Sequence, residues 1–327
     1  MQAAVASVVI PTLNETGAIC ACLDSVLAQS EREIEVLVVD GGSTDTTRDL
    51  VESYQRVDPR IRLIDNPKRT QPCAMNVAAS HIRSQYLIRV DAHSTVPPRY
   101  VEQALSHLRT NKWGGVGGRK DGVALTPQGH AVAAALGSPV GVGNSTYHHG
   151  TTATVVDHIP FGAYPLEVVH DVGGWDETIF ANEDYEFDYR VRKSGRELLF
   201  DPELVIFWQT RERVSDLFRQ YRRYGRGKAR VLAKHPESAA VRHLVPAGIV
   251  GALGLAVAVA PFRPRFSATI VAPYAALIAA GSAGAAPKLE RESWKYLPAA
   301  FAAMHCGYGV GLIEETILGR PRKTGTV

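Results

Sequence analysis

Cysteine is scarce in this sequence, and its placement argues against two kinds of protein. No two cysteines form a C-x-x-C pair or a zinc-binding pattern, so no zinc module is predicted. The scarcity also argues against a disulfide scaffold and favours a reducing, cytosolic setting. A signal peptide is not expected, because the first apolar run stops at Pro11 without a preceding basic stretch. The four cysteines are Cys20, Cys22, Cys73 and Cys306.

A strong excess of charge of either sign is also lacking. The formal net charge is +3 over 327 residues, so we expect no nucleic-acid partner. The length suits one large domain with an appendage, or two domains. From about residue 244 the composition shifts to Ala, Gly, Val and Leu, and this shift predicts two domains, residues 1–232 and 233–327.

Strand and helix patterns alternate in the first third of the chain. Apolar runs predict strands over residues 6–11, 34–39, 61–64 and 86–90. Helical spacing predicts helices after each of them, the second with Ser43 as its N-cap. This order predicts an α/β fold with a mostly parallel sheet covered on both faces. Ligands of such sheets bind at the carboxyl ends of the strands.

Polar residues follow three of these strands, over residues 11–15, 40–44 and 91–93. Asp91 and His93 are two residues apart, so in an extended chain both side chains point to one side. A carboxylate and an imidazole together can hold a divalent cation, which in turn can hold a diphosphate. Each segment alone could be a plain turn or a helix start. Their order and spacing together favour one ligand site, although Gly41 and Gly42 match neither a Rossmann nor a P-loop motif.

At these residues the sequence resembles family 2 glycosyltransferases, which carry a GT-A nucleotide-sugar-binding domain. The resemblance rests on the segments Val8–Glu15, Val36–Asp45 and Val90–His93, in this order. It implies that Asp40 hydrogen-bonds the base and that Asp91 lies near the ribose and diphosphate, sharing a metal with His93. The other donor-binding residues that it implies are Pro11, Asn14, Glu15, Lys68 and Asn76.

One position departs from the family pattern. The common motif is D-x-D, whereas His93 replaces the second Asp here. Histidine is a competent ligand for Mn²⁺ but a poor one for Mg²⁺, which prefers oxygen ligands. The implied cofactor therefore remains a divalent metal, Mn²⁺ or Mg²⁺.

A second acidic cluster precedes a predicted helix that ends at Gly195. Acidic residues at a helix start are favoured by the helix dipole, which is one interpretation of Glu183 and Asp184. The other is a general base that takes the proton of the acceptor hydroxyl. The family resemblance gives that role to Asp184, with Trp175 as a wall for the acceptor sugar. A single base without a protein nucleophile predicts inversion at the anomeric carbon.

A basic amphipathic helix is predicted over residues 211–230. Its segment Gln220-Tyr-Arg-Arg-Tyr224 is similar to the Q-x-x-R-W element of membrane-bound family 2 enzymes. That similarity places Gln220 and Arg223 near the acceptor and the diphosphate. A helix lying on anionic lipid would suit the same face. Both interpretations stay open.

Three apolar stretches come next, over residues 244–260, 266–286 and 297–318. Their length and their Ala and Gly content suit helices packed in a membrane, although a soluble helical lobe is an alternative. Glu314 and Glu315 argue against lipid around the third stretch. We expect attachment to the inner membrane, with the catalytic domain facing the cytoplasm.

The arrangement as a whole resembles bacterial exopolysaccharide glycosyltransferases of the succinoglycan type. It implies an inverting, metal-dependent enzyme that moves a sugar from a nucleotide sugar, expected to be a UDP-sugar. The implied acceptor is a lipid-linked saccharide or a polyprenyl phosphate. One alternative is an inactive nucleotide-sugar-binding scaffold. A nucleotidyltransferase is another, but it would need a Gly- and Arg-rich phosphate loop, which residues 11–17 do not supply.

Overall fold

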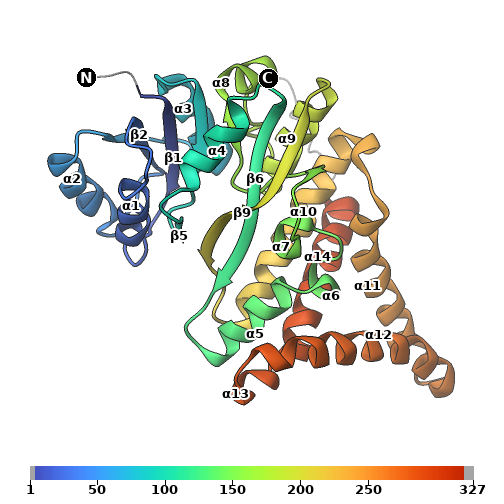
Figure 1. The fold of residues 1–327 in the computed structure, drawn as a ribbon. Helices are drawn as coiled ribbons and strands as arrows, with labels where there is room; N and C mark the ends of the chain where they lie inside the picture. Colours follow the sequence, from blue (N-terminus) through green and yellow to red (C-terminus); the bar gives the residue numbers. More distant parts are fainter. Residues whose placement is uncertain (1–3, 320–327) are drawn as a thin grey trace. The chain divides into compact units, whose positions relative to one another are not determined.

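The computed structural model describes residues 4–319, and the chain divides into two units (Figure 1). The first unit comprises the chain up to Asp121 together with Thr146–Gln209. The second comprises Gly122–Ser145 and the chain from Thr210 onward. The expected boundary between residues 232 and 233 therefore falls inside the second unit. It falls there because the basic helix packs on the last apolar helix.

A mixed sheet forms the centre of the first unit. Its strands follow the order β3-β2-β1-β4-β8-β6-β9-β5, with β7 paired to β9. The pairs among β1 to β4 are parallel, as the alternation of strands and helices predicted, whereas β8 joins β4 in the antiparallel sense. The strands are β1 (Ala6–Thr12), β2 (Ile34–Asp40), β3 (Ile61–Asp65), β4 (Tyr86–Arg89), β5 (Ser94–Thr95), β6 (Trp113–Val123), β7 (Thr154–Val156), β8 (Ala163–Pro165) and β9 (Glu197–Gln209).

Each face of the sheet is covered by helices because alternate residues of a buried strand point to opposite sides. In β1, Val8 and Ile10 belong to one apolar core and Val9 to the other. The first core is completed by α1 (Ile19–Leu27), α2 (Thr47–Val57) and α4 (Tyr100–Leu108). The second is completed by α3 (Gln71–His81), α8 (Leu166–Asp171) and α9 (Glu183–Lys193).

Two local predictions about helix ends have different outcomes. Gly195 has a φ of +89°, so it takes the left-handed conformation expected just beyond the end of α9. Ser43 is not an N-cap, because α2 begins only at Thr47 and the side chain of Ser43 bonds to Asp40 instead. The residues between β2 and α2 therefore form a longer turn than predicted.

The second unit is helical and is built around α14 (Leu297–Leu318). The remaining helices of the unit are α5 (Pro127–Leu136), α6 (Pro139–Val142), α10 (Val214–Lys234), α11 (Val241–Val259), α12 (Pro264–Ala285) and α13 (Arg291–Trp294). The short helix α7 (Thr146–His149) belongs to the first unit.

Glycines and ion pairs join α10 to α14. A Cβ on Gly311 of α14 would overlap the carbonyl oxygen of Arg222 on α10, so the two backbones are in close contact. Nε of Arg222 lies 2.7 Å from Oε2 of Glu314, and Nε of Arg226 lies 2.9 Å from Oε2 of Glu315. These pairs explain two acids in an otherwise apolar stretch. They also show that α10 packs on protein rather than on lipid alone.

Three helical segments are long and apolar enough to cross a membrane, judged by length and composition. They span Val241–Val259, Pro264–Lys288 and Arg291–Leu318. Only 11% of the apolar window is buried in each of the first two, against 56% in the third. The first two segments therefore expose apolar surface over most of their length, which suits lipid contact.

Candidate active site

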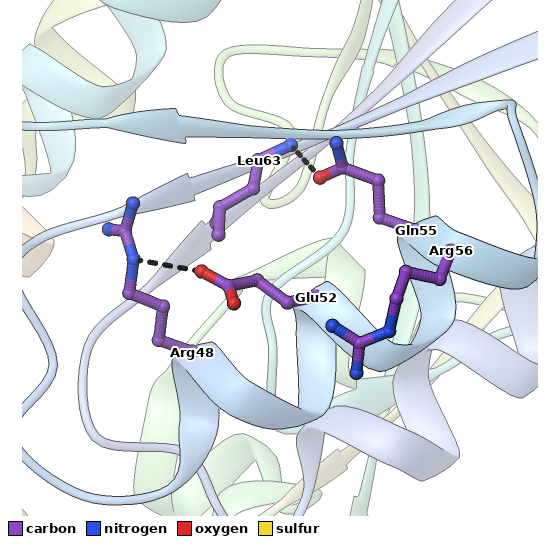
Figure 2. Close-up of a pocket in the computed structure, with 5 residues that line it drawn as sticks. All are labelled: Arg48, Glu52, Gln55, Arg56 and Leu63. Atoms are coloured by element: carbon purple, nitrogen blue, oxygen red, sulfur yellow. Dashed lines mark hydrogen bonds and ion pairs between the residues drawn. The ribbon is translucent and has the colours of Figure 1, made fainter.

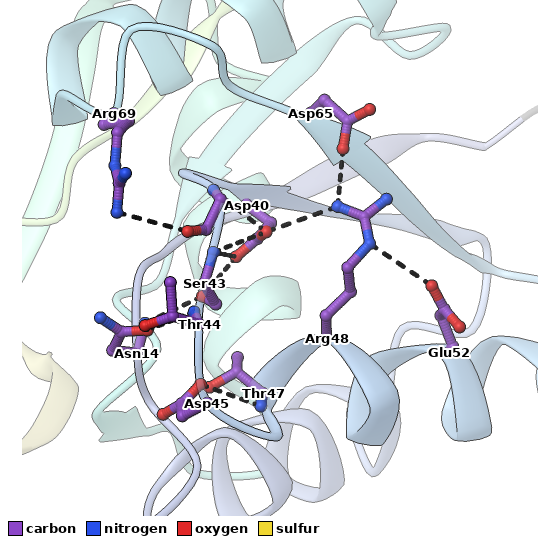
Figure 3. Close-up of polar contacts among 11 residues, drawn as sticks. Asn14, Asp40, Ser43, Thr44, Asp45, Thr47, Arg48, Glu52, Asp65 and Arg69 are labelled. Carbon is purple, nitrogen blue, oxygen red and sulfur yellow. Dashed lines mark hydrogen bonds and ion pairs between the residues drawn. The ribbon is translucent and has the colours of Figure 1, made fainter.

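The ends of β1 and β2 meet at one edge of the sheet, as predicted. Pro11 pairs with Val39 in the parallel register. Just beyond the strands, the N–H of Asn14 donates to Oγ of Ser43 at 2.9 Å, and Oδ1 of Asn14 accepts from the N–H of Thr44 at 2.8 Å (Figure 3). Asn14 has a φ of 56°, a left-handed conformation that asparagine tolerates. The two predicted donor-binding segments therefore form one connected surface.

Asp40 shapes the turn after β2. Its carboxylate accepts hydrogen bonds from the N–H groups of Gly42 and Ser43, each at 3.1 Å, and from Oγ of Ser43 at 2.5 Å (Figure 3). Arg48 lies between Asp40 and Asp65, with its Nη1 3.5 Å and 2.7 Å from their carboxylates. Asp40 is only 2% exposed, so its first role is to hold the turn. The hydrogen bond to a base stays a prediction.

Asp91 follows β4 and is held by a buried arginine. Nε and Nη2 of Arg89 donate to its two oxygens at 2.8 and 3.2 Å. Burial favours the neutral acid, but the charge and hydrogen bonds of Arg89 keep the pKa of Asp91 below its usual value. The backbone turns here rather than running on as a strand, since the N–H of Ser94 bonds to the carbonyl of Asp91 at 2.9 Å. The extended geometry that we predicted for Asp91 and His93 is therefore wrong.

The side chain of His93 faces the end of β1. Its Nδ1 lies 3.1 Å from Oε1 of Glu15. A carboxylate on one ring nitrogen orients the imidazole and leaves Nε2 for a metal, as in many histidine sites. Asp91 keeps further lone pairs beyond those that Arg89 uses. This donor set fits a divalent cation such as Mn²⁺.

The protein would supply only part of such a coordination shell. Among residues 4–319, no three His, Cys, Asp or Glu side chains are grouped so as to hold a metal. Asp91 and His93 would therefore share the ion with oxygens of a diphosphate and with water. This arrangement is usual where a metal is bound together with a phosphate substrate.

Glu183 and Asp184 begin α9 at the same site. Oδ1 of Asp184 accepts from the N–H of Tyr185 at 2.8 Å, so the residue does bond to the helix start. Burial opposes ionisation of Asp184, but the charges of His158 and Arg89 hold its pKa below the usual value. Burial and the charge of Asp184 raise the pKa of Glu183 to about 7. Near neutral pH, Asp184 is therefore the ionised member of the pair and the one able to accept a proton.

Arg89 joins the two acidic groups. Its Nη1 lies 3.9 Å from Oδ2 of Asp184, while its other nitrogens bind Asp91. The guanidinium of Arg89 thus contacts both Asp91, which was predicted to bind the donor, and Asp184, which was predicted to be the base. Sequence reasoning passed over Arg89, although an arginine inside an apolar strand is a signal in itself, because a buried charge needs partners.

Lys120 on β6 is a second cation that sequence reasoning missed. Its Nζ lies 3.8 Å from the ring centroid of Trp208 and 5.0 Å from that of Phe161. Burial lowers the pKa of Lys120 to about 8, although the charges of Asp91 and Asp184 act in the opposite direction. No motif marks this lysine, because β6 joins the site only through the antiparallel half of the sheet.

Other predicted residues make contacts within the protein. The amide of Asn76 bonds to both the carbonyl and the N–H of Trp175, at 2.8 and 2.7 Å, and Lys68 pairs with Glu177 at 2.5 Å. Trp175 is 3% exposed and stacks on Phe187 at 4.1 Å, so neither face of its ring is open to a sugar. The prediction that Trp175 forms a wall for the acceptor is therefore wrong.

Gln220 and Arg223 lie on α10 in the second unit. Nε2 of Gln220 lies 3.1 Å from the hydroxyl of Tyr224, one helical turn further on. Its Oε1 is buried and has no hydrogen-bond partner in the part of the chain that the structure describes. Their predicted contact with the acceptor and the diphosphate stays a prediction.

A pocket of about 410 Å³ lies on α2 and β3 (Figure 2). Charged and amide side chains dominate its lining, and none of the predicted site residues is among them. Arg48 also contacts Asp40, but the other lining residues lie outside the site described above, so we assign the pocket no part in it. Its lining residues are Arg48, Glu52, Gln55, Arg56 and Leu63.

Comparison with known families agrees with this geometry. The family model for glycosyl transferase family 2 matches residues 7–138, and that for glycosyl transferase family group 2 matches residues 86–284. The chain is 33% identical over 245 residues to the succinoglycan biosynthesis protein ExoA of Rhizobium meliloti, covering 74% of each chain. It is 24% identical over 238 residues to a dolichyl N-acetyl-alpha-D-glucosaminyl phosphate 3-beta-D-2,3-diacetamido-2,3-dideoxy-beta-D-glucuronosyltransferase of Methanococcus voltae, covering 70% of this chain and 74% of the relative.

Solved structures share the fold at low sequence identity. The mannosyltransferase PcManGT of Pyrobaculum calidifontis, solved with GDP-Man and Mn²⁺, superposes with a TM-score of 0.63 at 18% identity, covering 98% of this chain and 89% of the other. TarS of S. aureus, residues 1–349 with UDP, gives 0.52 at 17% identity, covering 99% and 94%. These likenesses establish the GT-A fold. Together with the family models and the Rhizobium relative, they show that this chain is an enzyme that belongs to glycosyltransferase family 2.

Proposed function

We propose that the chain transfers a sugar from a UDP-sugar to a lipid-linked saccharide or polyprenyl phosphate during exopolysaccharide synthesis. The observation that carries the proposal is the placement of Arg89 between Asp91 and Asp184. The buried guanidinium of Arg89 thereby connects Asp91, the proposed donor-side residue, to Asp184, the proposed base. The Rhizobium relative, named for succinoglycan biosynthesis, supports the pathway, and the structural neighbours with UDP or GDP-Man support a nucleotide-sugar donor.

Asp91 and His93 would hold the metal in this reaction, with Glu15 orienting the imidazole. The metal, when bound, would stabilise the negative charge that develops on the departing diphosphate. Arg89 and Lys120 add positive charge at the same place without any rearrangement of the protein. The expected donor contacts of Asn14 and Asp40 would position the nucleotide at the neighbouring strand ends.

Asp184 would act as the general base. Its carboxylate is kept ionised by His158 and Arg89 and can therefore accept the proton of an acceptor hydroxyl. The acceptor oxygen would attack the anomeric carbon in a single displacement, which inverts its configuration. Proton NMR of the product would read the anomeric configuration, and a retained configuration would contradict this mechanism.

The apolar helices support a membrane location for the acceptor. A polyprenyl-linked acceptor lies in the bilayer, and α11 and α12 expose enough apolar surface to enter it. We propose attachment to the inner membrane, with the sheet domain on the cytoplasmic side, where nucleotide sugars are made.

Calorimetry on the full chain in detergent tests the donor site. UDP, GDP and dTDP would be titrated with and without Mn²⁺ into the wild type, Asp91→Ala and Asp184→Asn. We expect UDP binding that needs Mn²⁺ and is lost in Asp91→Ala, because the variant removes a metal ligand and unpairs Arg89. Asp184→Asn should bind UDP normally but transfer sugar about a hundredfold or more slowly.

The two variants separate binding from catalysis. If the wild type bound no nucleotide, Asp91 and His93 would be structural residues, and an inactive scaffold would be the better interpretation. If Asp184→Asn transferred sugar at the wild-type rate, the base would have to be another residue.

A further inference from the structure

Lys120 is held by two aromatic rings rather than by carboxylates. Its Nζ lies 3.8 Å from the ring centroid of Trp208 and 5.0 Å from that of Phe161. Within residues 4–319, the ammonium makes no hydrogen bond and no ion pair. A ring face stabilises a cation without using its N–H groups. All three N–H donors of Lys120 are therefore available to a ligand.

The ring of Trp208 belongs to a strand that is paired with the predicted metal segment. Trp208 is 4% exposed and lies opposite Ser94 in the antiparallel register of β5 and β9. Ser94 directly follows His93, and the N–H of Gln209 donates to the carbonyl of His93 at 3.1 Å. The ring that carries Lys120 is therefore fixed beside the segment of His93.

The ring of Phe161 brings Lys120 together with Arg89. Cζ of Arg89 lies 5.4 Å from the centroid of this ring, so both cations contact the same side chain. Phe161 has a φ of 52°, a left-handed conformation that is strained for a bulky residue. Such strain persists only where the surrounding structure enforces it, and it clusters at functional sites. The observed strain points to a functional position for the Phe161 ring.

The two cations differ in what they can still bind. Arg89 is 6% exposed and donates from Nε and Nη2 to Asp91, while its Nη1 lies 3.9 Å from Asp184. Lys120 is only half-buried, so a ligand can reach it. Burial lowers the pKa of Lys120 to about 8 against the charges of Asp91 and Asp184, so the ammonium is mostly charged at neutral pH. Of the two, Lys120 is the cation that can take an anionic ligand.

We propose that Lys120 binds the diphosphate of the nucleotide sugar directly, on the phosphate that is bonded to the sugar. During transfer the bond between the anomeric carbon and this phosphate oxygen breaks, and its electron pair leaves with the diphosphate. Lys120 keeps its proton and stabilises the added negative charge. Phe161 is a positioning residue that acts through Lys120. This inference rests on the proposed function and assigns the diphosphate contact to one side chain.

The chemistry of the departing group favours a phosphate as the ligand. The phosphate that leaves the sugar gains a second negative charge, since the second pKa of a phosphate ester is about 6. A lysine ammonium is a compact charge that suits a single phosphate oxygen. The described part of the chain groups no three His, Cys, Asp or Glu side chains as metal ligands, so a further cation at the diphosphate has a use. Lys120 would supply that charge.

The test measures the binding of UDP and UMP by calorimetry with Mn²⁺, on the full chain in detergent. Lys120→Met keeps the length of the side chain without its charge, Lys120→Arg keeps the charge, and Phe161→Leu removes the shared ring. Lys112→Met is the matched control, because Lys112 is exposed and lies just before the same strand. Sugar transfer would be measured from the UDP-sugar that binds to a synthetic polyprenyl-diphosphate monosaccharide.

We expect Lys120→Met to lower the affinity for UDP about tenfold or more and to leave the affinity for UMP unchanged, because only UDP has the second phosphate. The kcat for transfer should fall at least as much, since the charge on that phosphate grows as the bond breaks. Phe161→Leu should lower the ratio of UDP to UMP affinity to a smaller extent. Lys120→Arg should keep most of this ratio, and Lys112→Met should match the wild type.

Three results would overturn the inference. A wild-type affinity ratio and kcat in Lys120→Met would make the contact of Lys120 with the two rings purely structural. Equal losses of UDP and UMP affinity would exclude a contact with the second phosphate. A wild type that binds no nucleotide would remove the proposed function as well, and that failure is distinct because it appears before any variant is compared. If Lys120→Met does not fold, as judged by thermal unfolding, Lys120→Gln decides by the same ratio.

Discussion

Arg89 shows how single residues set the charge states of the site. The buried guanidinium is neutralised by Asp91 through two hydrogen bonds and lies 3.9 Å from Asp184. A buried charge of this kind is stable only with such partners. Burial and the charge of Asp184 raise the pKa of the neighbouring Glu183 to about 7, although the charge of Arg89 acts in the opposite direction. The site therefore combines ionised carboxylates with one that is neutral near pH 6.

Glu183→Gln should alter the pH dependence of stability. The pKa of Glu183 is about 7 in the folded protein against 4.5 for the unperturbed group, so the folded state binds the extra proton. Protonated Glu183 therefore adds up to about 3 kcal/mol to the free energy of unfolding. This contribution is complete below about pH 4.5 and is lost as the pH rises through 7. The variant should therefore lose less stability than the wild type between about pH 5 and 8. Thermal unfolding in detergent would measure this.

The exposed Glu167 on α8 offers a control for that experiment. Glu167→Gln changes the same chemical group outside the buried cluster and should follow the wild-type curve. If Glu183→Gln also followed the wild-type curve, Glu183 would be ionised in the folded protein throughout this range.

The pairing of α10 with α14 is the dominant contact between elements in the second unit. Glycines on both helices allow it: a Cβ on Gly225 would overlap the carbonyl of Tyr308, and one on Gly307 would lie 2.7 Å from the carbonyl oxygen of Phe218. The backbones therefore approach more closely than side chains would permit. The ion pairs of Glu314 and Glu315 then bind the polar face of α10 to the end of α14.

Gly311→Ala should destabilise this pairing. The added methyl group would overlap the carbonyl of Arg222, and overpacking of this kind typically costs about 1–3 kcal/mol, more than the gain in helix propensity. Gly251→Ala on α11 is the matched control, since a Cβ there meets nothing within 4 Å. The apparent Tm should fall for Gly311→Ala and hold or rise slightly for Gly251→Ala. Equal values would mean that the helices can separate without loss of stability.

At the scale of the whole molecule, the candidate active site and the candidate membrane helices belong to different units. The sheet unit holds the charged site, and the helical unit holds the three apolar segments. The unit boundary does not follow the order of the chain, because residues 122–145 join the helices that come after residue 210. The candidate membrane helices α11 and α12 are also the least buried of the apolar segments.

Leu255→Arg should weaken attachment to the membrane. Leu255 on α11 is 53% exposed, and an arginine inside a membrane helix is unfavourable, by up to roughly 2.5–3.5 kcal/mol at the helix centre. Val57→Arg on α2 is the control, since Val57 is 86% exposed but lies outside the unit that holds the apolar helices. The share of protein that stays in the membrane pellet after alkaline carbonate should fall only for Leu255→Arg. Equal shares would indicate that α11 does not contact lipid.

Features that depend on local pattern could be predicted from the sequence. Period-two and period-3.6 spacing located the first strands and helices, and parallel pairing brought Pro11, Asp40 and Asp91 to one edge of the sheet. The apolar content of the last third located the candidate membrane helices. The turn at Asp91 and the burial of Trp175 were not predictable in this way, because they depend on which distant residues pack nearby.

The sequence by itself determined the parallel half of the fold and the three long apolar helices, and it predicted the acidic residues of the candidate site, because each of these features depends on residues close together along the chain. Only the tertiary structure decided that Arg89 joins Asp91 to Asp184, that Lys120 comes to the same place and that His158 rests on Asp188. The physical reason is that these contacts cross an antiparallel half-sheet whose strands are far apart in the chain. Burial and charge pairing there depend on three-dimensional packing, which cannot be predicted from the spacing of residues along the chain.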